Sequence, residues 1–378
     1  MFGVPPVQQH LTDKLPAELS GRDLPGVHDL VQKALRRRGR RVQQVLFGAV
    51  VVVHQGRAIA VEHPVRDEWW DDRSLLPLLD RVQVPVYLGC DWEDVPLHLP
   101  GSLRPVNALP NSPHVRVVLV GDHGISWPWE SLHVEALAWY DHWLKGRDTG
   151  ILDGPSFRYQ LRKGESDGWR TADAWPVPSV AHRELALCSD GKLSTSGGEA
   201  GQRTYMTLGA GLNRAQASEA DPPPSLTWET EPFTGDLDVL GNTELRLDAT
   251  ASAADTAWII TLQDVAADDT TTEVTAGFVR ASLRAVDETA SEPGAPSLPC
   301  TSVAAVPINE PVSYRIPIIG TGYRFAAGHR LRLVLTSDDQ DPNFPADMSF
   351  RHASVGTSSL NRIAASSRLL LPVSAGEL

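Results

Sequence analysis

Hydrophobic positions in the first 150 residues follow a helical period in some segments and form short apolar runs in others. Apolar residues recur at helical spacing over residues 24–38, which predicts an amphipathic helix there. A short helix is expected over 74–80 and a longer one over 129–145, which should end at Gly146. Leu132, Ala136, Trp139, Tyr140 and Trp143 are expected on one side of the longer helix.

Two apolar runs in this part, residues 84–89 (VPVYLG) and 115–121 (VRVVLVG), each end in glycine. Short continuous apolar runs are typical of central strands in a parallel sheet that is buried on both faces. Residues 100–109 can form the crossover helix between them, and the helix over 129–145 follows the second strand. The order strand, helix, strand, helix predicts part of an α/β sheet.

The pattern changes near residue 154 to a period of two. Residues 183–187, 243–247 and 329–335 alternate apolar and polar side chains, as strands with one buried face do. Turn-rich segments at 217–225 and 291–299 separate such runs, and no helix-period stretch of any length follows Lys145. The second part is therefore predicted to be all-β, an antiparallel β-sandwich of the jelly-roll kind over roughly residues 180–375.

Composition restricts the class of protein. The hydrophobic content of 42% and charged content of 21% are ordinary for a globular chain. A formal charge of −13 argues against nucleic acid as a partner, and the basic run at 36–41 is expected at the end of a helix, where cations suit the dipole. The sequence has no signal peptide pattern and no apolar stretch long enough to cross a membrane. Three widely spaced cysteines form neither a disulfide framework nor a zinc pattern, so a cytoplasmic location is expected.

The candidate chemistry begins with the search for a serine nucleophile. The G-x-S-x-G sequence that seats the nucleophile of many serine hydrolases occurs once, at residues 164–168 (GESDG), but no helix-period segment follows it to complete the strand–turn–helix of an elbow. Gly124-Ile125-Ser126-Trp127-Pro128 resembles such an elbow only superficially, because its fifth residue is a proline suited to starting a helix. No histidine pair has metal spacing and no glycine-rich phosphate loop is present, so no cofactor or metal is expected.

Several motifs, in order along the chain, resemble the cocaine-esterase/glutaryl-acylase (CocE/NonD) family, whose C-terminal module is that of X-Pro dipeptidyl-peptidases. These motifs lie at residues 63–74, 84–87, 135–146, 155–175, 231–234, 245–247, 277–282 and 323–333. The resemblance implies an α/β-hydrolase domain with a helical cap, followed by a jelly-roll sandwich of galactose-binding-like type. The corresponding parts are a cap remnant and helical region over 1–82, the C-terminal part of the hydrolase domain over 83–153, a bridge over 154–180 and the jelly roll over 181–378.

The resemblance also implies a reaction and a place for its residues. Members cleave esters, β-lactam side-chain amides or Xaa-Pro bonds through an acyl-enzyme, so a small-molecule ester or a peptide is the expected substrate. The turn Asp91-Trp92-Glu93-Asp94 occupies the position of the family's G-W-x-D acid turn, and Asp94 aligns with the acid, with Asp91 as the alternative.

The base of the family follows the next strand. Ile125 occupies the position of its histidine, and His123 lies two residues earlier, so His123 is the candidate base. His133, within the helix predicted over 129–145, is the other candidate.

The family's early strands, its serine elbow and its oxyanion tyrosine have no counterpart in the sequence, and Met1 falls where the cap should be. The resemblance therefore implies a chain that is N-terminally truncated relative to the family and inactive alone. Two alternatives remain open. One is a non-catalytic binding protein that uses the jelly roll, and the other is half of a split enzyme that associates with an N-terminal hydrolase half through an exposed sheet edge.

Overall fold

A computed structural model of the chain describes residues 62–93, 98–121, 128–165, 168–207, 224–338 and 358–378, without the side chains of 128–131. The helix predicted over 24–38 and the basic run at 36–41 lie outside these residues. The chain divides into two compact units, Met1–Pro64 and Val65–Leu378. Every described strand belongs to the second unit.

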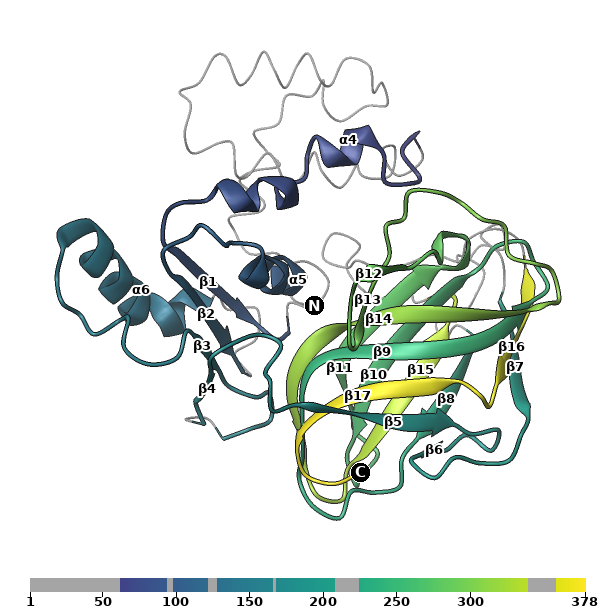
Figure 1. Cartoon of the computed structure of the whole chain (residues 1–378). Helices are drawn as coiled ribbons and strands as arrows, with labels where there is room; N and C mark the ends of the chain where they lie inside the picture. Colours follow the sequence, from purple (N-terminus) through teal and green to yellow (C-terminus); the bar gives the residue numbers. More distant parts are fainter. Residues whose placement is uncertain (1–61, 94–97, 122–127, 166–167, 208–223, 339–357) are drawn as a thin grey trace, which may run out of the picture. The chain divides into compact units, whose positions relative to one another are not determined.

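A four-stranded sheet contains the two apolar runs that the sequence marks as strands (Figure 1). Its strands, in spatial order, are β1 (Val86–Asp91), β2 (Val115–Val120), β3 (Phe157–Tyr159) and β4 (Arg170–Ala172). β1 and β2 are parallel, as predicted, and β3 is parallel to β2 while β4 is antiparallel to β3. The segment expected to be only a bridge thus adds two strands to this sheet.

The helices near this sheet largely follow the predictions. They are α4 (Glu68–Asp71), the 3₁₀ helix η3 (Leu76–Arg81), α5 (His98–Leu103), the 3₁₀ helix η4 (Arg104–Asn107) and α6 (Pro128–Lys145). The helix predicted over 74–80 is the 3₁₀ helix η3, and the crossover helix predicted over 100–109 is divided into α5 and η4, with Pro105 in the first turn of η4. α6 ends at the predicted residue because Gly146 adopts a φ of +64°, which is favourable for glycine.

α6 packs on the sheet through one side only. Leu132 and Trp139 are buried, and the ring of Trp139 lies 5.6 Å from that of Tyr87 on β1. Trp143 lies one turn further on, 5.8 Å from Trp139. Tyr140, expected on the same side, is 59% exposed, because it lies about 100° around the helix from Trp139.

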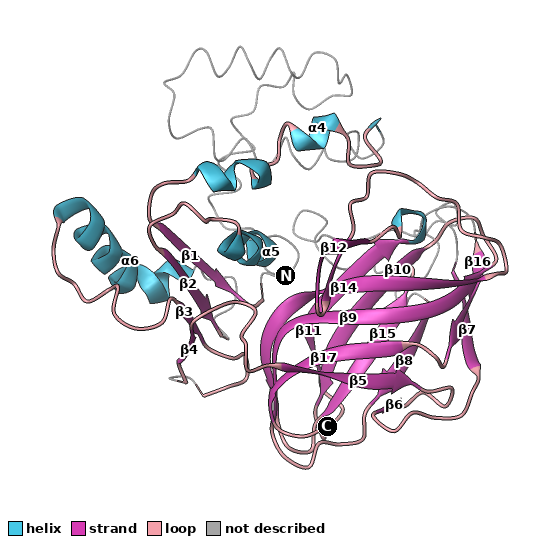
Figure 2. Ribbon diagram, viewed as in Figure 1, coloured by secondary structure: helices cyan, strands magenta, loops and turns pink. Residues whose placement is uncertain are grey.

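The second part of the chain is a β-sandwich built from one long, mostly antiparallel sheet that folds over on itself (Figure 2). The main strand order is β6-β5-β17-β9-β14-β11-β10-β15-β8, while β16 pairs with both β7 and β9. The strands are β5 (Ala181–Leu187), β6 (Leu193–Ser194), β7 (Gln202–Thr207), β8 (Ser225–Glu229), β9 (Leu237–Ala251), β10 (Ala257–Val265), β11 (Thr271–Arg280), β14 (Pro311–Phe325), β15 (Arg330–Thr336), β16 (Ser359–Ala364) and β17 (Arg368–Ala375). A separate hairpin, β12 (Asp287–Glu292) and β13 (Ala295–Ser297), follows the short 3₁₀ helix η6 (Ala281–Leu283).

The core of the sandwich follows from the two-residue period. On β15, Leu331, Leu333 and Leu335 are fully buried, while the intervening Arg330 and Arg332 reach solvent. Trp228, Trp258 and Tyr323 fill the space between the layers, together with aliphatic residues from nearly every strand. Period two therefore predicted the core-facing side of β15 correctly, whereas in β9 both sides are buried over much of the strand.

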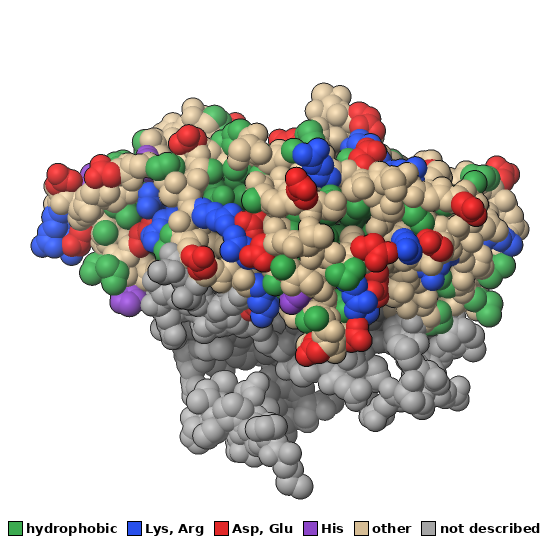
Figure 3. Space-filling view, turned by 90° about the horizontal axis from the view of Figure 1, so that it is seen from below, with side chains coloured by type: hydrophobic (Ala, Val, Ile, Leu, Met, Phe, Trp, Pro, Cys, Tyr) green, Lys and Arg blue, Asp and Glu red, His purple; other side chains and the backbone are tan. Residues whose placement is uncertain are grey.

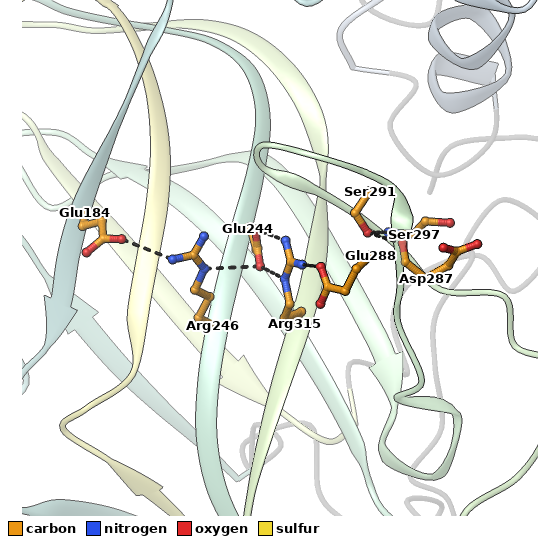
Figure 4. A network of polar contacts seen from close by, with 8 residues as sticks. All are labelled: Glu184, Glu244, Arg246, Asp287, Glu288, Ser291, Ser297 and Arg315. Atoms are coloured by element: carbon orange, nitrogen blue, oxygen red, sulfur yellow. Dashed lines mark hydrogen bonds and ion pairs between the residues drawn. The ribbon is translucent and has the colours of Figure 1, made fainter.

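Charged side chains on the outer side of this sheet form a row of ion pairs (Figure 4). Glu244 on β9 is completely buried and accepts two hydrogen bonds from Arg315 on β14, at 2.6 and 3.1 Å. Arg315 also pairs with Glu288 of the β12–β13 hairpin, and Arg246 pairs with Glu184 on β5. The row ties the hairpin to the strands beneath it. On the face shown in Figure 3, acidic and basic side chains are likewise interspersed.

Gly277 provides a test of the sandwich packing. It pairs with Ile318 where β11 meets β14, and a Cβ at this glycine would lie 2.8 Å from the Ile318 Cα and closer still to the Pro317 carbonyl oxygen. Gly277→Ala should therefore reduce the free energy of unfolding by about 1–3 kcal/mol, measured by urea denaturation. Gly235→Ala is the matched control, because a Cβ there meets no atom within 4 Å. Equal losses in the two variants would contradict the packing described.

Candidate active site

The carboxyl end of β1 carries the described part of the candidate acid turn. Asp91 is the last residue of β1 and lies beside Val120, the last residue of the parallel strand β2. The Asp91 side chain is buried, and its Oδ1 accepts a hydrogen bond of 2.9 Å from the amide of Glu93. Because parallel strands end at the same edge, the segments after β1 and after β2 both start there, as a triad acid and base require.

The two residues predicted as acid and base, Asp94 and His123, lie outside the described residues. Of the alternatives, Asp91 has the buried position given above. His133 lies in the first half of α6 with an exposed side chain. The predicted acid–base pairing therefore stays a prediction.

Trp92 anchors the turn in the interior. Its side chain is completely buried, and the indole Nε1 donates a 2.6 Å hydrogen bond to the carbonyl oxygen of Gln160. The ring packs 6.1 Å from Trp175, and Phe157 lies 5.3 Å from Trp175 in turn. These rings belong to a hydrophobic cluster that also includes Leu119 of β2 and Leu240 of β9 in the sandwich.

Glu93 makes the charged contact of the turn. Its Oε1 lies 3.2 Å from a terminal nitrogen of Arg162, whose side chain is only 7% exposed. Sequence reasoning missed Arg162, because it lies in the segment assigned to a bridge and no periodic pattern surrounds it. The sequence shows only an arginine between Leu161 and Lys163, and a single arginine does not identify the residue with which it pairs.

A second ion pair, with its carboxylate buried, crosses from the four-stranded sheet to the sandwich. Asp238 on β9 accepts hydrogen bonds from Arg324 on β14, at 2.7 and 3.0 Å, and from Arg170 on β4, at 2.8 Å. Burial alone raises the pKa of the Asp238 carboxyl, but the hydrogen bonds from Arg324 and Arg170 outweigh burial and bring this pKa below its usual value.

Within the described residues, no group of three or more His, Cys, Asp or Glu side chains could hold a metal ion. No helix among them is long and apolar enough to span a bilayer.

Comparison with protein families supplies the assignment. The family model for the X-Pro dipeptidyl-peptidase C-terminal non-catalytic domain matches residues 149–347, which is more than half of the chain. The chain belongs to this family. It is a CocE/NonD family protein with an X-Pro dipeptidyl-peptidase C-terminal domain, as the sequence motifs indicated.

Individual relatives of this CocE/NonD protein agree. The cocaine esterase of Rhodococcus sp. (strain MB1 Bresler) is 26% identical over 346 residues, covering 80% of this chain and 56% of the esterase. A CocE/NonD family hydrolase from Staphylococcus aureus has a similar structure, with a TM-score of 0.70 at 19% identity over 82% of this chain and 58% of that one. An aminopeptidase from a marine sediment archaeon, Thaumarchaeota archaeon, gives a TM-score of 0.63 at 19% identity, covering 85% of this chain and 60% of that one. This CocE/NonD chain thus spans a little over half the length of each of these three relatives.

The ion pairs of Asp238 should make the stability of this CocE/NonD protein depend on pH. Its native pKa is lowered, so its contribution is complete above the unfolded-state value of about 3.9 and is lost as the pH falls through the native pKa. Asp238→Asn should reduce the free energy of unfolding by roughly 2–4 kcal/mol at pH 7, and the difference from wild type should shrink below about pH 4.

Urea denaturation between pH 3 and 7 measures this difference. Asp269→Asn is the control, because Asp269 also pairs with an arginine, Arg330, but is 79% exposed. A loss for Asp238→Asn that is as small as the control's, or that does not change with pH, would contradict the role assigned to Asp238.

Proposed function

We propose that this chain is the acid-and-base end of a CocE/NonD serine hydrolase, and that its residues alone do not turn over substrate. The reaction of such a hydrolase is acyl transfer to water from an ester or Xaa-Pro amide. One observation carries the proposal. The turn that carries the candidate acid follows β1 at the carboxyl edge of a parallel sheet, yet the single G-x-S-x-G of the sequence, residues 164–168, lies between the strands β3 and β4 and not between a strand and a helix.

The proposal includes a division of the chain into domains. Residues 83–153 correspond to the C-terminal part of an α/β-hydrolase domain, 154–180 to a bridge, 181–378 to a jelly roll and 1–82 to a cap remnant. The parallel pairing of β1 with β2, followed by α6, supports the first assignment. We place the protein in the cytoplasm, an assignment supported by its free cysteines Cys90, Cys188 and Cys300.

In the complete reaction, a serine hydroxyl attacks the acyl carbon while a histidine takes its proton, and a carboxylate orients that histidine. We assign the acid to Asp94 and the base to His123. The engagement of Asp91 with the amide of its own turn favours Asp94, since the Asp91 carboxylate already serves the local backbone. The location of His133 within α6, rather than after a strand end, favours His123.

Without an activated hydroxyl, the acid and base have no attacking atom to serve. We therefore expect that a fluorophosphonate probe does not label the purified chain and that an aryl acetate is not hydrolysed above the rate in buffer. A full-length serine esterase serves as the positive control. Labelling that is lost in Ser166→Ala, at the serine of the G-x-S-x-G sequence, or in Ser126→Ala would identify a nucleophile in this chain and overturn the proposal.

The edge of the four-stranded sheet favours a second candidate function, that of one half of a split enzyme. Among the described strands, β1 pairs only with β2. Apolar side chains are exposed before β1 and along α6, namely Leu75, Leu76, Leu78, Val84, Val134, Leu137, Tyr140 and Leu144. An unpaired strand edge beside exposed apolar side chains suits a partner that adds a strand and covers the helix. We propose that this partner is an N-terminal hydrolase half.

Co-production with the amino-terminal portion of a CocE/NonD relative that carries G-x-S-x-G tests this association. We expect a one-to-one complex in light scattering, weakened at least about tenfold by the double substitution Leu137→Glu and Leu144→Glu, because each places a charge in the apolar contact. Met206→Glu is the matched control, as Met206 is an exposed apolar residue on β7 of the sandwich. Failure of the wild-type chain to form a complex, or equal weakening by the control, would rule out this surface.

A further inference from the structure

Arg162 is joined through its backbone to the sandwich. Its amide donates a 2.9 Å hydrogen bond to the carbonyl oxygen of Gly322 on β14, and the amide of Arg324 donates one of the same length to the Arg162 carbonyl oxygen. These two bonds form a parallel bridge between Arg162 and Tyr323. The residue therefore belongs to the segment after β3 and is held by the edge of β14.

The guanidinium of Arg162 forms hydrogen bonds with both the sandwich and the acid turn. One terminal nitrogen donates to the carbonyl oxygens of Glu273 and Val274 on β11, at 3.2 and 3.1 Å. The other donates to Glu93 Oε1 at 3.2 Å. A single buried side chain thus connects the acid turn to a strand of the sandwich, and a charged donor fixed at several points is a strong restraint.

Trp92 provides the second connection. A Cβ at position 322 would lie 2.7–2.9 Å from three atoms of the Trp92 indole, so the indole lies directly on the backbone of β14. Only glycine allows this approach. Two successive residues of the turn, Trp92 and Glu93, are therefore held by groups that belong to the sandwich or are bonded to it.

Within the described residues, the backbone of the turn makes few hydrogen bonds. The amide of Trp92 reaches the Val120 carbonyl oxygen at 3.4 Å, which is long for such a bond, and the amide of Glu93 donates to Asp91 Oδ1. A catalytic acid must be held to within about 0.5 Å of its working position. Among the described contacts, the side chains of Trp92 and Glu93 therefore supply most of the restraint on this turn.

We propose that the β-sandwich, the domain described as non-catalytic, fixes the acid turn of the hydrolase, and that Arg162 is the positioning residue through which it does so. That this turn carries a catalytic acid rests on the proposed function. The restraint on the turn is a property of this chain and can be measured without turnover.

Hydrogen–deuterium exchange of peptides covering residues 88–93 tests the proposal. Arg162→Met removes the donors while keeping most of the side-chain volume, and it should speed exchange of the Trp92 and Glu93 amides about tenfold. Exchange in the central strand β9 should stay within about twofold of wild type, since the core there does not depend on Arg162. Arg332→Met is the matched control, because Arg332 pairs with Glu229 inside the sandwich and should leave the turn unchanged.

Two further variants keep the test decisive. Glu93→Ala removes the contact from the side of the turn and should give the same local increase, so it decides the matter alone if Arg162→Met does not fold. Arg162→Lys should restore part of the protection, because it keeps the charge opposite Glu93 but not the several simultaneous hydrogen bonds. Unchanged exchange of the turn in Arg162→Met and Glu93→Ala, or an increase that is equal in β9 or in Arg332→Met, would overturn the proposal. A failure of the serine-probe experiment would leave these outcomes unaffected.

Discussion

The described structure depends on the close approach of Trp92 to the backbone of Gly322. The indole occupies the space in which any other residue at position 322 would place its Cβ, so the four-stranded sheet and the sandwich meet at van der Waals distance. The ion pair between Glu93 and Arg162 lies next to this contact, and the ion pair between Arg170 and Asp238 crosses from the sheet to the sandwich. Ion pairs with a buried partner are favourable only when the two groups are close and well oriented, which makes the packing of one tryptophan on one glycine a condition for the charged contacts.

The sequence predicted those parts of the fold that depend on local periodicity. The apolar runs became the parallel strands β1 and β2, and the stop at Gly146 was placed correctly because a left-handed glycine is a local property of the chain. Alternation likewise identified strands of the sandwich and, for β15, the buried side. The prediction for Tyr140 was wrong because it assigned too many residues to the buried side of α6, which is narrow.

The candidate site was predictable only in part. The turn after β1 could be found because it follows a strong strand signal and contains carboxylates at the position that the family motif gives. Arg162 and Asp238 could not be assigned, since their partners lie 69 and 68 residues away along the chain. Such contacts leave no periodic trace, and an arginine in a connecting segment looks the same whether it is solvated or buried. The strands β3 and β4 escaped prediction for a related reason, because three residues are too few to establish a period.

The contacts that hold the turn after β1 can be considered apart from any catalytic role of that turn. The members of a catalytic triad act as a unit, so the rate enhancement does not divide among them, and an acid and a base alone contribute almost nothing. The contacts that hold the turn, in contrast, serve folding as well. Trp92 fills the core between sheet and sandwich, and Arg162 satisfies two carbonyl groups of β11 that would otherwise lack these hydrogen bonds. Removing them would cost stability whether or not a serine is present, so the physical support of the acid turn is maintained by packing and not by catalysis.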